Sequence, residues 1–222
     1  MMPLDDLQRQ VAVIVLDAAA RHGFALAGGC ALIEHGLVNR RTEDVDLFTN
    51  EEDGVRAAAD AVEASLRAAS FATEREDKTG GLADLFPGMG EGLAEWMVTS
   101  PAGQYVRLQM SYFDRGRMPV IMDIGPVLDL DDLVAGKTIA LASRAAERDY
   151  IDTAAALGRG YSVGRVIGLA KDLDPGLDDR DFAEAGDRLD RLDDKVFARY
   201  GLDSRDIARI RENFTDWPRS RP

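Results

Sequence analysis

Residues Ala27 to Phe48 read AGGCALIEHGLVNRRTEDVDLF. The glycines Gly28 and Gly29 follow a short apolar run, and because they lack Cβ atoms the backbone there can turn sharply and approach a ligand closely. The pattern predicts a buried strand before this turn, at Phe24 to Ala27, and a helix after it, from Cys30 to His35. Free N–H groups at the start of such a helix are suited to an anion such as a phosphate.

The same stretch ends in a predicted strand that carries two carboxylates, from Glu43 to Phe48. Side chains alternate between the faces of a strand, so Asp44 and Asp46 share one face, about 7 Å apart. Two carboxylates can hold Mg²⁺ together with the phosphates of a substrate. Alone, a Gly-Gly is ordinarily a turn and a D-x-D an exposed strand edge, but their order, with Arg40-Arg41 between them, favours a nucleotide site.

A second charged set lies further along the chain, at Lys137, Arg144, Arg148 and Asp152. If the helix is continuous, their spacing places the four side chains within a sector of about 80°. The functional hypothesis is that Lys137 contacts a triphosphate, that the arginines support phosphate or acceptor, and that Asp152 orients an arginine or serves as a base. The alternative is a solvent-facing helix with an Arg148–Asp152 pair.

Composition sets outer limits on the function. With 222 residues and 45% hydrophobic content the chain can form a substantial core in one or two domains. A single cysteine excludes an intrachain disulfide and favours a reducing compartment. The net charge of −13 argues against a general nucleic-acid coat, although it leaves room for a local basic patch. The longest apolar run, Val11 to Ala20, is too short to span a membrane, so we expect a cytoplasmic protein without a membrane partner.

The hydrophobic pattern predicts the order of the elements. An α/β domain is expected over residues 1–127 and a helical domain over 128–222, with the second contributing to the active site. The expected helices are Leu4 to His22, Glu51 to Ser70, Asp129 or Asp131 to Arg144, Ala145 to Leu157, one capped by Ser162, Asp178 to Tyr200 and Ser204 to Asn213; the further strands are Phe71 to Glu76, Leu93 to Thr99, Gln104 to Phe113 and Met118 to Ile124; a loop is expected at Thr79 to Gly92.

The glycine turn, the acid pair, K-T-I-A-L-A-S-R from Lys137 and R-D-Y-I-D from Arg148 occur in an order that resembles a known family. They are similar to the AbiEii/AbiGii-type nucleotidyltransferase toxins, which include the MenT toxins of MenAT toxin–antitoxin systems. The resemblance covers roughly Gly28 to Leu157. It implies an α/β (α+β) fold with a DNA polymerase β-like nucleotidyltransferase core, built on a small mixed sheet and followed by a helical C-terminal part.

The resemblance also implies an activity: transfer of nucleotides, often pyrimidines from CTP or UTP, to the 3′ end of tRNA. Such transfer blocks translation, and a cognate antitoxin restrains the toxin. The expected co-substrate is an NTP and the expected cofactor is Mg²⁺. The predicted residues are Asp44, Asp46, Lys137 and Asp152 for catalysis, Asp44 and Asp46 for the metal, and Gly28, Gly29, Cys30, Arg41, Lys137, Arg144 and Arg148 for the nucleotide.

Two positions depart from the family pattern. Cys30 stands where Ser or Thr is common, so a hydroxyl contact to phosphate is lost or replaced by a weak thiol donor. Gln109 stands where a third acidic residue is usual, which suggests chemistry with one metal ion. Two other functions stay open at this point: a nucleotidyltransferase that modifies a small molecule or a protein, and a nucleotide-binding module without catalytic activity.

Overall fold

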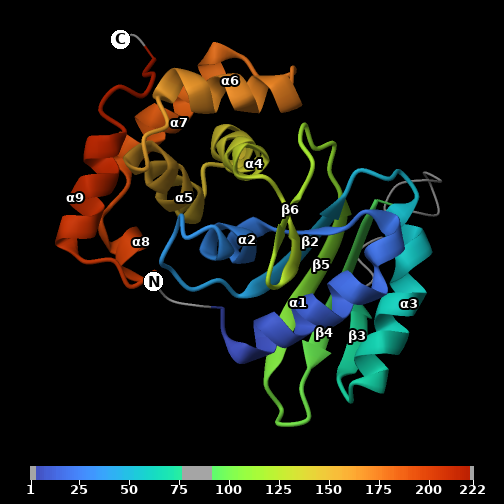
Figure 1. The fold of residues 1–222 in the computed structure, drawn as a ribbon. Helices are drawn as coiled ribbons and strands as arrows, with labels where there is room; N and C mark the ends of the chain where they lie inside the picture. Colours follow the sequence, from blue (N-terminus) through green and yellow to red (C-terminus); the bar gives the residue numbers. More distant parts are fainter. Residues whose placement is uncertain (1–3, 77–91, 221–222) are drawn as a thin grey trace. The chain divides into compact units, whose positions relative to one another are not determined.

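The structure is a computed structural model that describes residues 4–76 and 92–220. The chain divides into two compact units, drawn in Figure 1 with the labels used below. The first, here called the sheet unit, holds the described residues of 4–34 and 42–129. The second, the helical unit, holds residues 130–220 together with His35–Arg41, a segment that interrupts the sheet unit in sequence.

The sheet unit is built on a seven-stranded mixed sheet in the order β3-β4-β5-β2-β1-β7-β6. β2 runs parallel to β5 and β1 parallel to β7, whereas the other neighbouring strands are antiparallel. The strands are β1 (Ala25–Ala27), β2 (Asp44–Thr49), β3 (Ala72–Glu76), β4 (Leu93–Thr99), β5 (Tyr105–Tyr112), β6 (Val120–Met122) and β7 (Gly125–Val127).

Two amphipathic helices of the sheet unit, α1 (Asp6–Ala18) and α3 (Gly54–Ala68), pack against each other and against the strands (Figure 1). The carboxylate of Asp5 begins α1 by accepting a hydrogen bond from the backbone N–H of Gln8, and the Asp5 N–H donates one to Oε1 of the Gln8 side chain. The apolar faces of both helices are buried. A short 3₁₀ turn, η1 (Ala20–His22), and the helix α2 (Gly28–Glu34) flank β1.

The alternation predicted for β2 is present. Val45 and Leu47 are fully buried, whereas Asp44 and Asp46 are half-buried on the opposite face. The strand therefore fills the core with one set of side chains and presents carboxylates with the other.

The helical unit consists of α4 (Leu130–Ser143), α5 (Glu147–Gly158), α6 (Val163–Leu173), α7 (Asp179–Arg191), α8 (Lys195–Ala198) and α9 (Ser204–Asn213). α4 packs against α5, α6 and α7, and α5 also packs against α8 and α9. Buried aromatic rings pack together between these helices. The distance between ring centroids is 5.7 Å for Tyr150 and Phe214, 4.8 Å for Phe214 and Trp217, and 6.3 Å for Phe182 and Trp217. Such pairs stabilise by more than their buried area alone.

The α/β class with a mixed sheet and a helical C-terminal part is confirmed, but three details of the prediction are wrong. The helix expected over 178–200 is two helices, because Leu192 adopts an extended conformation after α7. Gly125–Val127, expected to end a strand, forms β7 and pairs with both β1 and β6. The four charged residues Lys137, Arg144, Arg148 and Asp152 do not lie on one continuous helix, because α4 ends at Ser143 and Ala145 takes a left-handed φ of 49°.

The loop expected at Thr79 to Gly92 lies outside the described residues except for Gly92. Among the described helices, none has the length and apolar character that crossing a membrane requires.

Tyr150 provides a test of this helical core. Its hydroxyl donates a 2.8 Å hydrogen bond to the carbonyl oxygen of Ala185, and burial raises its pKa to about 12. An unfolded tyrosine titrates near pH 10, so the neutral phenol contributes its full stability below about pH 10 and loses it as the pH rises through about 12. Replacing Tyr150 with Phe should lower the free energy of unfolding by about 1 kcal/mol at neutral pH, measured by urea denaturation.

A titration of tyrosinate absorbance in the wild type and in Tyr150→Phe gives the matching control. The component that disappears in the variant should titrate near pH 12. Loss of a component that titrates near pH 10 would contradict the buried, hydrogen-bonded phenol.

Candidate functional site

The glycine turn and the acid pair lie next to each other in the sheet unit. β1 and β2 are antiparallel with Ala27 opposite Asp46, so the residue that follows β1 stands beside the Asp46 side chain. That residue, Gly28, has a left-handed φ of 57°. A Cβ atom on Gly28 would overlap Oδ2 of Asp46 and lie 2.6 Å from its Cγ. The Asp46 carboxylate therefore occupies the space that any other residue at position 28 would fill.

The acid face of β2 suits a divalent cation that is shared with a ligand. Asp44 and Asp46 are half-buried on the same face, and the Gly28 backbone beside them carries no side chain. No group of three His, Cys, Asp or Glu side chains among residues 4–76 and 92–220 is placed to hold a metal. The pair still fits Mg²⁺, because this ion is ordinarily bound through one or two carboxylates while phosphates and water complete its octahedron.

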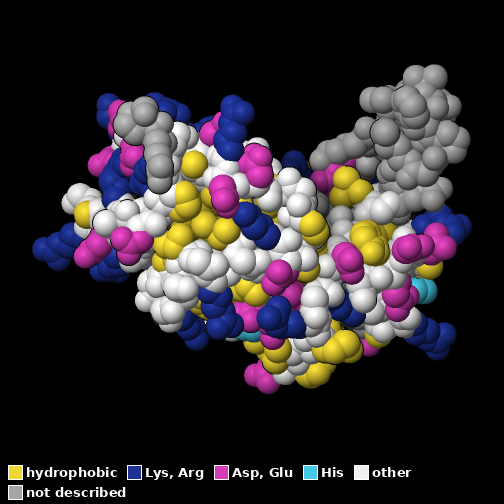
Figure 2. Space-filling model, turned by 90° about the horizontal axis from the view of Figure 1, so that it is seen from above, with side chains coloured by type: hydrophobic (Ala, Val, Ile, Leu, Met, Phe, Trp, Pro, Cys, Tyr) yellow, Lys and Arg dark blue, Asp and Glu magenta, His cyan; other side chains and the backbone are white. Residues whose placement is uncertain are grey.

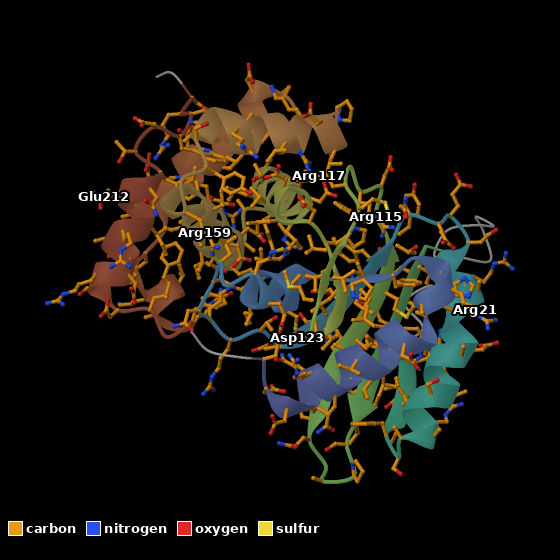
Figure 3. The ribbon with its side chains drawn as sticks, in the orientation of Figure 1. Arg21, Arg115, Arg117, Asp123, Arg159 and Glu212 are labelled. Atoms are coloured by element: carbon orange, nitrogen blue, oxygen red, sulfur yellow. The ribbon has the colours of Figure 1, made fainter. Side chains whose placement is uncertain are left out.

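The neighbouring strand β5 carries Gln109 at the position where the family pattern predicts a third carboxylate. In the register of β2 and β5, Gln109 lies directly opposite Asp46, and Arg107 lies opposite Asp44. Two acids near this strand in sequence lie in connections: Asp114 is exposed after β5, and Asp123 is exposed in the turn between β6 and β7 (Figure 3). Neither belongs to the β2–β5 row.

One further carboxylate of this row is not evident from the sequence. Glu95 on β4 is opposite Gln109, so Asp46, Gln109 and Glu95 stand on one face of three adjacent strands. Glu95 is only 6% exposed. Nothing in the sequence marks this residue, because only the pairing of β4 with β5 brings it into the row.

Cys30 has a structural role in the same region. Its thiol is fully buried and donates a 3.2 Å hydrogen bond to the backbone carbonyl oxygen of Asp44, which ties α2 to β2. Burial, together with the negative charges of Asp46, Asp5 and Asp44, raises the pKa of the thiol, so it stays neutral. Its hydrogen-bond donor is used within the protein, so a contact of Cys30 with a nucleotide would have to come from its backbone.

In the helical unit, the predicted residues Lys137 and Asp152 meet in a buried ionic cluster that also contains Arg40. The guanidinium of Arg40 binds both carboxylate oxygens of Asp152, with Nε to Oδ1 and Nη2 to Oδ2 each at 2.7 Å. Nζ of Lys137 lies 2.9 Å from Oδ2. The Asp152 side chain is fully buried, that of Arg40 is 5% exposed and that of Lys137 is 15% exposed.

The ionisation of this cluster follows from two opposing effects. Burial by itself raises the pKa of Asp152, but the positive charges of Lys137 and Arg40 outweigh it, so the pKa lies below its ordinary value. Burial lowers the pKa of Arg40, and the bond to Asp152 more than reverses that effect. Asp152 is thus a carboxylate held between two cations.

The other predicted basic residues lie elsewhere in the helical unit. Arg41 is exposed, and its carbonyl oxygen accepts a 2.9 Å hydrogen bond from Nη1 of Arg40. Arg144 follows α4 and binds both oxygens of the buried Asp149 at 2.9 and 3.1 Å. Arg148 lies on α5 and is half-buried. The alternative of a solvent-facing helix with an Arg148–Asp152 pair does not fit the structure. Asp152 is buried and is bound by Arg40 and Lys137.

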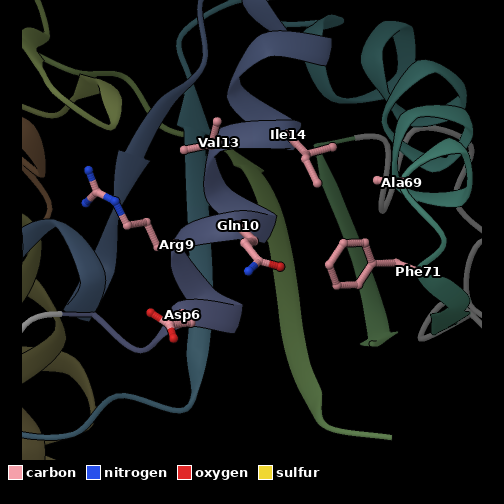
Figure 4. Close-up of a pocket in the computed structure, with 7 residues that line it drawn as sticks. All are labelled: Asp6, Arg9, Gln10, Val13, Ile14, Ala69 and Phe71. Carbon is pink, nitrogen blue, oxygen red and sulfur yellow. The ribbon is translucent and has the colours of Figure 1, made fainter. Parts of the chain in front are cut away.

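A shallow groove of about 510 Å³ lies on the helix side of the sheet unit (Figure 4). It is lined by α1 residues and by the turn that leads into β3, namely Asp6, Arg9, Gln10, Val13, Ile14, Ala69 and Phe71. None of the predicted site residues lines this groove, so it has no part in the candidate site.

Solved structures of other proteins share this architecture. The chain resembles MenT4, a nucleotidyltransferase toxin of Mycobacterium tuberculosis, with a TM-score of 0.61 and 16% identity over 94% of this chain and 82% of that one. It also resembles JHP933 from Helicobacter pylori, with a TM-score of 0.58 and 12% identity over 95% of this chain and 91% of that one. At these identities the likeness shows the shared fold.

The sequence gives the family directly. The model for the nucleotidyl transferase AbiEii toxin of type IV toxin–antitoxin systems matches residues 14–218. The chain therefore belongs to the AbiEii nucleotidyltransferase toxin family, as its motifs predicted, and it is a nucleotidyltransferase. No curated protein sequence matches it.

The contact between Gly28 and Asp46 can be tested with a matched pair of substitutions. Gly28→Ala places a Cβ against the Asp46 carboxylate and also forces alanine into a left-handed conformation. Gly103→Ala imposes only the second change, because Gly103 has a φ of 78° and nothing lies within 4 Å of its Cβ position. We expect Gly103→Ala to lower the free energy of unfolding by about 1 kcal/mol and Gly28→Ala to lower it by clearly more. Equal losses in urea denaturation would show that Asp46 does not press on Gly28.

Proposed function

We propose that this nucleotidyltransferase adds nucleotides, preferably pyrimidines from CTP or UTP, to the 3′ end of tRNA and thereby blocks translation. The main observation in support of nucleotide binding is that the Asp46 carboxylate lies against the backbone of Gly28, which has no side chain. A metal-bound phosphate can approach a backbone without a side chain closely. The resemblance of the motifs to the MenT toxins supports the tRNA acceptor and the pyrimidine preference.

In this proposal Asp44 and Asp46 hold a single Mg²⁺ ion together with the phosphates of the NTP. When bound, Mg²⁺ neutralises negative charge that develops on the phosphates during transfer. The residue directly opposite Asp46 is the neutral Gln109, so the proposal assigns one ion to the two carboxylates of β2. Gly28 and Gly29, with the backbone of Cys30, provide the turn that the triphosphate approaches.

The basic residues of the helical unit serve the same nucleotide in this proposal. Lys137 contacts the triphosphate, because its ammonium is the most exposed group of the buried ionic cluster. Asp152 acts as the charge partner that fixes Lys137 in place. Arg41, Arg144 and Arg148 are further contacts to the phosphates or to the acceptor.

The reaction is an in-line displacement. The 3′-hydroxyl of the acceptor attacks the α-phosphate and loses its proton to solvent, the new phosphodiester bond forms, and the bond to the leaving pyrophosphate breaks. Acidic and basic side chains are interspersed on the face drawn in Figure 2, and the chain has a net charge of −13, so the RNA contacts in this proposal are those of individual arginine and lysine residues. We further propose that the protein acts in the cytoplasm and that a cognate antitoxin protein restrains it.

The decisive assay incubates the protein with total tRNA, Mg²⁺ and labelled CTP or UTP. We expect label on the 3′ end of tRNA, and loss of that label when EDTA removes the metal. Asp46→Asn should reduce transfer by at least about 100-fold, because the lost metal contact is worth several kcal/mol in the transition state.

The matched control is Asp123→Asn, which removes an exposed carboxylate from a turn of the same sheet (Figure 3). This variant should retain wild-type transfer. Label on a protein or small molecule but not on RNA would replace the tRNA proposal with the alternative acceptor. Transfer by Asp46→Asn at the wild-type rate would refute the role of the acid pair.

A further inference from the structure

Arg40 takes no part in the function proposed above, yet it makes the strongest contacts of the ionic cluster. Its two hydrogen bonds engage both oxygens of Asp152, whereas Lys137 shares only one of them. Both Arg40 and Asp152 are buried, so water screens their interaction little. Arg40 is therefore the residue that holds both oxygens of Asp152, and Lys137 is a second counter-ion on one of them.

The charge of the cluster depends on this arrangement. Two cations and one carboxylate leave a net charge of about +1. Without the guanidinium, the carboxylate would be neutralised by Lys137 alone and the cluster would carry no net charge. A neutral Lys137–Asp152 pair attracts a phosphate far less than a lysine that keeps its charge available.

We infer that Arg40 is a positioning residue for nucleotide binding: it neutralises Asp152 and so keeps the positive charge of Lys137 available to a triphosphate. This inference rests on the proposed function, in which Lys137 contacts the NTP. The inference assigns different roles to the two adjacent arginines. Arg40 acts through the ionic cluster, whereas Arg41 is exposed.

The competing explanation is that Arg40 only fastens the segment His35–Arg41 to the helical unit. The structure offers a direct control, because Arg159 at the end of α5 holds the same segment by other contacts (Figure 3). Its Nη1 donates to the carbonyl oxygen of Gly36 at 2.9 Å and to that of His35 at 3.3 Å. Removing Arg159 loosens the segment without altering the charges around Lys137.

The test measures the affinity of the full chain for inorganic tripolyphosphate and for CTP, each with Mg²⁺, by calorimetry. Tripolyphosphate reports the phosphate contacts independently of the base. Arg40→Gln, which keeps hydrogen-bonding capacity but removes the charge, should weaken tripolyphosphate binding by about tenfold or more. Arg40→Lys should lie within about threefold of the wild type because it retains the charge. Arg159→Ala should bind like the wild type.

The double variant Arg40→Gln/Asp152→Asn separates charge from fastening. It removes one cation and one anion, so the cluster regains the charge of Lys137, and tripolyphosphate affinity should rise about threefold or more above that of Arg40→Gln. Thermal melts establish that each variant folds. If Arg40→Gln alone does not fold, Arg40→Lys decides, because it keeps the charge without the planar guanidinium: affinity within about threefold of the wild type supports the inference, and affinity reduced about tenfold or more overturns it.

Two results would overturn the inference while leaving the proposed function intact. One is a double variant that binds no better than Arg40→Gln, and the other is Arg159→Ala binding as weakly as Arg40→Gln. Failure of the proposed function has a different signature. In that case Lys137→Ala would bind tripolyphosphate and CTP as tightly as the wild type, which would remove the role of Lys137 on which the inference rests.

Discussion

The Asp46 carboxylate fills the space that a Cβ atom at position 28 would need, and the candidate site of the sheet unit depends on this constraint. Because a Cβ at position 28 would overlap Asp46, the chain needs glycine after β1, and the left-handed φ of Gly28 adds a second reason. The same close approach fixes where the carboxylate points. The alternation of β2 then places Asp44 on the same face, while Val45 and Leu47 anchor the strand in the core. The need for glycine at position 28 is thus linked to the position of the acid pair on β2.

The helical unit buries a full negative charge, that of Asp152. An isolated buried carboxylate would be strongly destabilising, so Asp152 can remain ionised only with partners. Arg40 provides a two-pronged, planar contact and Lys137 a point charge on the second oxygen. Replacing such a cluster with apolar residues is often neutral or stabilising, so its presence alone says little about stability. Its three residues come from the three motif stretches of the sequence, and the role proposed for them is phosphate binding.

Several features could be predicted from the residues because local physics fixes them. The period-two pattern of β2 located the acid pair, and the glycine pair located the turn, each without tertiary information. Other predictions failed where the chain departs from regular spacing. The helical angle computed across Lys137 to Asp152 assumed one helix, but the turn at Ala145 separates two, and Lys137 and Asp152 meet because α4 packs on α5. The adjacent residues Arg40 and Arg41 look alike in the sequence, whereas in the structure only Arg40 is buried against Asp152.

By itself, the sequence determined the family, the α/β class, the glycine turn and the two carboxylates that share a face of β2, because these depend on residue identity and on the repeat of a strand. Only the tertiary structure decided which charges neutralise one another and which side chains complete a row. Glu95 joins Gln109 and Asp46 through the pairing of three strands, and Arg40 reaches Asp152 across 112 residues of chain. Contacts of this kind depend on how distant segments pack, and the local pattern of residues contains no record of that distance.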